Sequence, residues 1–212
     1  MRSSDIATIS RVVLAVVIVY MIFLKVNPWA TIALISVAFL SDAVDGYLAV
    51  REESKGSISF GYYLSAALGD KVAKAKLKPI KERIAKHVPY GPRMDVAGDR
   101  VMEFSFWITF TYLDIIPVIV FLLVVIRHAF ADALMAGRGT SSKMKSKLAA
   151  AIYSSNLGRG GINIIKFLAY AYLVLVYVSG YPVDIGYALV AILFTYIMVR
   201  GAAEIYESLN NR

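Results

Sequence analysis

Two pairs of aspartates have the residue type and the spacing that metal-dependent chemistry needs. Asp42 and Asp45 stand three residues apart inside one apolar stretch, and Asp95 and Asp99 stand four residues apart at the start of another. Residues at these spacings share one face of a helix. Two such helices side by side would place four carboxylates in a small volume, where hard oxygen ligands suit Mg²⁺ or Mn²⁺. Two divalent cations held this way are the arrangement used for in-line phosphoryl transfer.

The composition restricts the class of protein that carries these carboxylates. The chain has 212 residues, of which 58% are hydrophobic, and this is too apolar for an ordinary soluble domain. Cysteine is absent and only two histidines occur, which excludes disulfides and thiolate sites and argues against zinc. A net charge of +8 is compatible with nucleic-acid binding, but in a membrane protein it reflects topology. We therefore expect no nucleic-acid partner.

Long apolar runs predict the elements that must position the aspartates. Each run is close to the roughly 20 residues that span a bilayer core. They cover approximately residues 11–26, 29–50, 94–113, 117–136, 162–179 and 185–203. We therefore predict an all-α integral membrane protein with six transmembrane helices, forming a single domain over residues 1–212.

Residues 52–90 lie between the second and third predicted spans and form an inserted cytoplasmic or interfacial element. Four apolar residues follow a helical stripe among its lysines, namely Leu77, Ile80, Ile84 and Val88. Such a stripe would suit the surface of an anionic membrane or a short helix packed on the bundle. Pro79 interrupts the pattern and is expected to disturb a helix here.

The distribution of basic residues predicts the orientation in the cell membrane. Of the 23 lysines and arginines, only Lys25 falls in the short loops on one side of the predicted bundle. The positive-inside rule then places both termini and both long basic segments in the cytoplasm. In this predicted multi-pass protein, all four aspartates fall at the cytoplasmic ends of their helices. The predicted active site therefore also faces the cytoplasm.

The order of these residues resembles a family signature. Asp42-x2-Asp45-Gly46-x2-Ala49, followed by Gly91-x3-Asp95-x3-Asp99, resembles the D-x2-D-G-x2-A-R-x8-G-x3-D-x3-D signature of the CDP-alcohol phosphotransferases. Thr8 and Arg11 are similar to the T-x-x-R that precedes the first helix of that family. The chain departs from the signature at two places. Val50 stands where the family has arginine, with Arg51 one residue later, and 39 residues (52–90) replace a spacer usually under ten.

The resemblance implies a reaction and a role for each motif residue. A CDP-linked lipid would donate a phosphatidyl-type group, phosphatidyl or archaetidyl, to an alcohol and release CMP. Asp99 would act as general base and complete the metal site. The predicted metal ligands are Asp42, Asp45, Asp95 and Asp99, and the predicted nucleotide-binding residues are Asp42, Gly46, Ala49, Arg51 and Gly91. Gly46 and Ala49 lack bulk, so a nucleotide could approach the helix backbone closely. Because the family is often dimeric, we also expect a homodimer.

Residues after the last aspartate suggest the acceptor. Arg100 and Glu103 follow Asp99, which resembles the phosphatidylinositol phosphate and archaetidylinositol phosphate synthase branch and favours inositol phosphate. Glycerol phosphate, serine and free inositol remain alternatives, as does CDP-inositol as the donor. Arginine can bind a phosphate through two nitrogens at once. Candidates for the acceptor phosphate are Arg127, Arg138, Arg159 and Arg200, although positive-inside charge or snorkelling to the interface would also account for them.

Two other classes of protein compete with this interpretation. A cation-coupled transporter would use the carboxylates to bind transported ions, but transporter sites usually lie near the membrane midplane, whereas these carboxylates fall at one membrane edge. A non-catalytic membrane scaffold would leave the clustered carboxylates unexplained.

Overall fold

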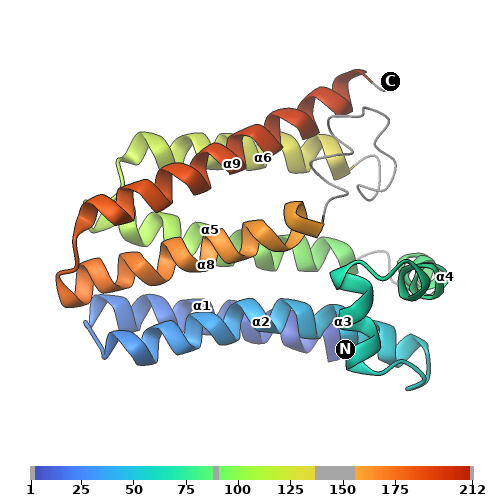
Figure 1. The fold of residues 1–212 in the computed structure, drawn as a ribbon. Coiled ribbons are helices and arrows are strands. Elements are labelled where there is room, and N and C mark those ends of the chain that lie inside the picture. The colour runs from blue at the N-terminus through green and yellow to red at the C-terminus, as the bar shows by residue number, and fades with distance from the viewer. Residues whose placement is uncertain (1–2, 88–90, 137–155, 211–212) are drawn as a thin grey trace. The chain divides into compact units, whose positions relative to one another are not determined.

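The computed structural model describes residues 3–87, 91–136 and 156–210. Within these ranges the chain forms eight helices and no strand (Figure 1). The helices are α1 (Ser3–Phe23), α2 (Pro28–Glu53), α3 (Phe60–Leu68), α4 (Lys71–His87), α5 (Gly91–Tyr112), α6 (Val118–Ala136), α8 (Asn156–Ser179) and α9 (Val183–Asn210). Each of the six apolar runs found in the sequence forms a helix.

Three of these helices are long and apolar enough to cross a membrane. They are α2, the part of α8 from Gly161 to Ser179, and α9, while Thr8–Phe23 of α1 is a shorter apolar segment. Large apolar side chains such as Val13, Leu40 and Ile192 remain exposed along the helices, as expected where lipid replaces water. The fold is therefore all-helical and consistent with a membrane protein, whereas six spans remain a prediction.

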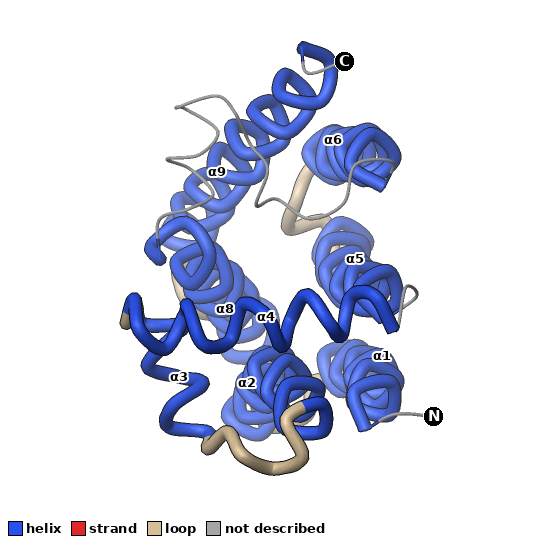
Figure 2. Tube along the Cα trace, turned by 90° about the vertical axis from the view of Figure 1, so that its right-hand side faces the viewer, coloured by secondary structure: helices blue, strands red, loops and turns tan. Residues whose placement is uncertain are grey.

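The chain divides into two compact units, Met1–Ser105 and Phe106–Arg212, and the division falls inside α5. In the first unit, α1 packs along α2, and α4 packs against both α2 and α3 (Figure 2). In the second unit, α9 packs against α6 and α8. The ring of Phe106 stacks on that of Tyr170 with centroids 4.7 Å apart, which joins the last turns of α5 to α8.

Local capping explains where the helices of the first unit begin. Asn27 accepts hydrogen bonds from the backbone N–H groups of Trp29 and Ala30, and Pro28 occupies the first turn of α2, where its missing N–H costs nothing. Asp70 caps α4 by accepting from the backbone N–H of Val72 at 2.8 Å. The turn between α1 and α2 therefore fixes the first residue of α2. The D-x2-D-G motif then lies in the C-terminal half of this helix.

The described part of residues 52–90, the predicted insertion, packs on α2 with its apolar stripe inward. Val50 of α2 joins a buried cluster with Ile58, Ala66, Ala73, Leu77 and Ile80, and Ile84 packs against it. Packing of a short helix on the bundle is therefore what the described residues show, and Val88 lies outside them. Pro79 interrupts the apolar pattern of the sequence but not the helix, because α4 continues through it from Lys71 to His87. Burial of Leu77 and Ile80 on the same face offsets the loss of one backbone hydrogen bond.

Candidate active site

The first pair of aspartates lies on the C-terminal half of α2. The helix is continuous from Pro28 to Glu53, so positions 42, 45 and 46 are spaced along it as the sequence predicts. The side chains of Asp42 and Asp45 lie outside the described residues. Ala49 is half-buried, and Arg51 is exposed in the last turn of the helix.

The second pair lies in the first turns of α5, which begins at Gly91. The side chain of Asp95 lies outside the described residues, and of Gly91 only its place in the helix is described. Asp99 is described, and 40% of its side-chain surface is exposed. Of the four predicted metal ligands, Asp99 is therefore the one whose side chain lies within the described residues.

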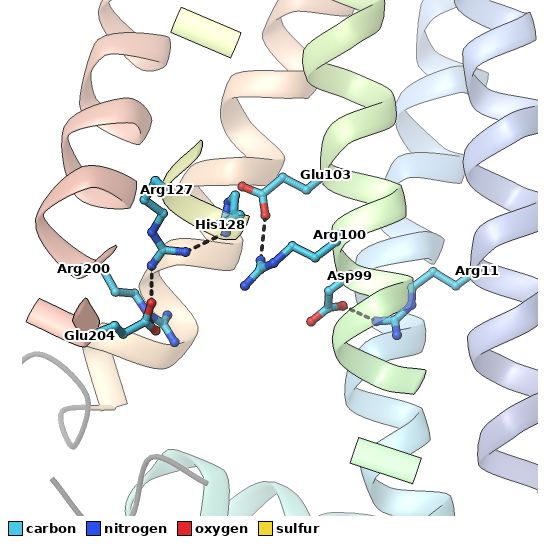
Figure 3. A network of polar contacts seen from close by, with 8 residues as sticks. All are labelled: Arg11, Asp99, Arg100, Glu103, Arg127, His128, Arg200 and Glu204. Atoms are coloured by element: carbon cyan, nitrogen blue, oxygen red, sulfur yellow. Dashed lines mark hydrogen bonds and ion pairs between the residues drawn. The ribbon is translucent and has the colours of Figure 1, made fainter. Parts of the chain in front are cut away.

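Asp99 is bound to an arginine that the chain supplies from 88 residues earlier. Arg11 Nη1 of α1 donates to Asp99 Oδ1 at 2.8 Å, and the Arg11 side chain is fully buried (Figure 3). A buried charge needs a partner of opposite sign, and Asp99 supplies it. The first helix and the start of α5 are thus joined by a charge-assisted hydrogen bond at the predicted general base.

Gly98 allows this close approach of α1 and α5. A Cβ atom at position 98 would lie 2.6 Å from Thr8 Cγ2 and 3.3 Å from Arg11 Nη2. The first distance is too short for any side chain, so glycine is required unless Thr8 moves. The T-x-x-R residues of α1 and the residue before Asp99 therefore form one packed contact.

A second ion pair follows along α5. Arg100 Nη1 lies 3.3 Å from Glu103 Oε2, and Glu103 is buried with 1% of its side-chain surface exposed. These are the two residues that suggested an inositol phosphate acceptor. In the described structure they contact each other within one helical turn.

The second unit holds its own polar cluster between α6 and α9. Arg127 Nη2 donates to Glu204 Oε2 at 2.7 Å, and Arg200 Nε lies 3.6 Å from Glu204 Oε1 (Figure 3). Arg127 Nη1 lies 2.6 Å from His128 Nδ1, which must accept this hydrogen bond because arginine has only donors. The Arg127 side chain runs across Gly201, where a Cβ atom would collide with it.

Two of the four predicted acceptor arginines are thus brought together. Arg127 and Arg200 contact the same carboxylate, whereas Arg138 and the side chain of Arg159 lie outside the described residues. Sequence reasoning missed Glu204 as a site residue. Its signal was available, because Glu204 stands four residues after Arg200 and one packed face of α9 continues through it. That face comprises Gly186, Val190, Leu193, Ile197, Gly201, Glu204 and Ser208.

Sequence reasoning also missed a residue that lies against Gly46. A Cβ atom at position 46 would collide with the hydroxyl oxygen of Tyr63 and would lie 3.4 Å from Tyr63 Cζ. The space that glycine leaves on this face of α2, which the sequence assigned to a nucleotide, is occupied by the hydroxyl of Tyr63 from α3.

The metal site itself remains a prediction. Among the described side chains, no group of three or more histidines, aspartates and glutamates could hold an ion, and three of the four predicted ligands fall outside that set. What the structure does provide is the partly exposed carboxylate of Asp99, whose oxygens are of the kind that Mg²⁺ and Mn²⁺ prefer.

Comparison with known proteins gives one match. Residues 1–58 match the family model of CDP-alcohol phosphatidyltransferase, and this part of the chain is therefore similar to that family. The matched segment contains Thr8, Arg11 and the D-x2-D-G-x2-A motif of α2, and it ends before Gly91, Asp95 and Asp99. No curated protein and no solved structure matched the chain.

Proposed function

We propose that this protein is a membrane-integrated CDP-alcohol phosphotransferase. It transfers a phosphatidyl-type group from a CDP-linked lipid to the hydroxyl of a polar alcohol and releases CMP. The observation that carries the proposal is the Arg11–Asp99 ion pair, which joins the family-like first helix to the last aspartate of G-x3-D-x3-D. A family match over residues 1–58 and an independent motif at 91–99 thus meet at one contact.

The residues of the first unit suit the proton transfer that this reaction requires. The acceptor oxygen forms a bond to the lipid-bearing phosphorus, the bond to the bridging oxygen breaks, and CMP leaves with that oxygen. The hydroxyl proton passes to Asp99, whose exposed carboxylate can receive it as general base. Arg11 holds the orientation of the Asp99 carboxylate from the buried side.

Two divalent cations complete the proposed site. Asp42, Asp45, Asp95 and Asp99 would hold Mg²⁺ or Mn²⁺, and the bound ions would neutralise charge on the diphosphate and on the departing CMP. The donor set fits because all four residues offer hard carboxylate oxygens, and 40% of the Asp99 side chain remains exposed.

For the acceptor we propose inositol phosphate, as in the phosphatidylinositol phosphate and archaetidylinositol phosphate synthase branch. Arginine can bind a phosphate through two nitrogens at once, and Arg127, Arg138, Arg159 and Arg200 remain the candidates for the acceptor phosphate. The basic segments support a cytoplasmic site and cytoplasmic termini, and the resemblance supports a homodimer.

The test is CMP release by the purified full-length protein in lipid, with a CDP-lipid donor and Mg²⁺ or Mn²⁺. Inositol phosphate, glycerol phosphate, serine and inositol are supplied in parallel, with Asp99→Asn as the control. Release that requires one acceptor and disappears in the variant supports the proposal and identifies the acceptor. Without release from any acceptor, CDP-inositol is tried as donor. If that also fails, cation flux into vesicles becomes the measurement, and flux would replace the enzyme by a transporter.

A further inference from the structure

The hydroxyl of Tyr63 lies on the face of α2 that carries the D-x2-D-G motif. Its oxygen occupies the position where a Cβ atom of Gly46 would stand, so the phenol tip touches the helix at this glycine. Tyr63 belongs to α3, which is part of the 39-residue segment (52–90) that interrupts the signature. The insertion therefore reaches the motif with a polar group.

The register of α2 shows where this hydroxyl stands along the helix. Positions 42, 46 and 50 follow each other at intervals of one turn and share one face. Val50 is buried in the apolar cluster that α3 and α4 form on α2. Gly46 comes next under Tyr63, and position 42, the first aspartate of the motif, lies one turn further on. The apolar cluster that α3 and α4 form on α2 therefore ends at the Tyr63 hydroxyl, one helical turn from position 42.

Side chains from α2 and α4 pack against the ring of Tyr63. Its centroid lies 5.9 Å from that of Tyr47 on α2, and Lys81 Nζ of α4 lies 5.3 Å from the ring centroid. Tyr47 also contacts Phe60 of α3 edge-on at 5.2 Å. A hydroxyl held by a packed aromatic group loses little entropy when it binds a ligand, and the nearby lysine adds positive charge for an anionic one.

We propose that Tyr63 is a donor-binding residue, whose hydroxyl donates a hydrogen bond to the diphosphate of the CDP-linked donor. The inserted helices α3 and α4 then form part of the donor site. This inference rests on the proposed function, because it assumes that the D-x2-D-G face of α2 receives the nucleotide diphosphate.

The test compares Tyr63→Phe with Tyr62→Phe in the full-length protein. Tyr62 is the matched control, since it is the neighbouring tyrosine of α3 and carries its own lysine, with Lys76 Nζ 5.4 Å from its ring centroid. CMP release is measured against CDP-lipid and against acceptor concentration separately, CMP binding is measured by calorimetry, and thermal unfolding monitors stability.

The expected result is specific to the donor. Loss of a hydrogen bond to a charged group should raise the KM for CDP-lipid and the Kd for CMP by about 10- to 100-fold in Tyr63→Phe. The KM for the acceptor should stay close to wild type, and Tyr62→Phe should match wild type throughout.

Two results overturn the inference while the enzyme class stands. One is an unchanged donor KM and CMP affinity in folded Tyr63→Phe. The other is a lower melting temperature and kcat with unchanged donor KM, which would make Tyr63 a structural residue. A wild-type protein that releases no CMP with any donor or acceptor removes both proposals, and that outcome is recognised before any variant is compared.

Discussion

Replacing Asp99 by asparagine is expected to reduce stability as well as activity. Arg11 is fully buried and Asp99 holds it at 2.8 Å, so the substitution leaves the guanidinium with a neutral partner at this position. Removing one member of a buried pair costs about 3–5 kcal/mol, and the 40% exposure of Asp99 reduces this to about 2 kcal/mol. For a chain of this size, the melting temperature should fall by about 4–8 °C.

A double-mutant cycle separates the electrostatic effect from the catalytic one. Arg11→Met removes the buried cation at similar length, and the double variant with Asp99→Asn removes both charges. We expect the double variant to be more stable than the sum of the single effects by about 2 kcal/mol, because the two charges no longer depend on each other. CMP release should remain at least about 100-fold reduced, since the general base is still missing.

Thermal unfolding in one detergent and CMP release under saturating donor are the two assays. Asp114→Asn is the matched surface control, because Asp114 is exposed in a turn where asparagine is equally tolerated, and it should stay within about 0.5 kcal/mol of wild type. If the melting temperature of Asp99→Asn equals that of wild type, the Arg11–Asp99 hydrogen bond does not stabilise the protein as proposed. The same conclusion follows if the stability losses of Arg11→Met and Asp99→Asn add up in the double variant.

The other predictions concern the α2 motif, the second polar cluster and the metal ions. Gly46→Ala should destabilise the protein by about 1–3 kcal/mol, because the new methyl group collides with the Tyr63 hydroxyl. Adding Tyr63→Phe should recover most of this stability, because the nearest ring atom, Cζ, is then 3.4 Å from the methyl group. An unchanged melting temperature in Gly46→Ala would contradict this. Glu204→Gln should cost about 3 kcal/mol by weakening the buried pair with Arg127, and adding Arg127→Met should restore part of it; equal melting of both variants would contradict the coupling. A chelator should abolish CMP release and Mg²⁺ or Mn²⁺ should restore it, whereas release that persists would exclude the metal site.

The helices could be predicted from the sequence, but some of their limits could not. An apolar run ends at its first polar residues, so the last helix was expected to stop near residue 203. Instead α9 continues to Asn210, because Glu204 and Ser208 lie on the same packed face as Ile197. The inserted helix α4 differs for a related reason. A proline suggests an interruption when it is considered alone, but burial of Leu77 and Ile80 on either side maintains the helix.

Pairing between distant residues was the part of the site that the sequence did not reveal. Arg11 is similar to the arginine of a T-x-x-R motif, but it also stands at the start of an apolar run, where the positive-inside rule expects a cation, and neither observation indicates its partner. Its role becomes visible only when α1 and α5 meet and Asp99 accepts its hydrogen bond. The same holds for Tyr63. The sequence has 14 tyrosines, and only the contact with Gly46 in the folded chain distinguishes this one.

The predicted insertion, residues 52–90, lies between the two halves of the aspartate motif. The match ends at residue 58, shortly after the inserted segment begins at Glu52, and the second half of the signature resumes at Gly91. If the insertion had displaced this second half, no contact should join it to the matched segment. The contact exists, because Arg11 from the matched segment binds Asp99 and Gly98 admits Thr8. Residues 52–90 therefore do not separate Asp99 from the first helix, and Tyr63 of this segment contacts α2 at Gly46 of the motif.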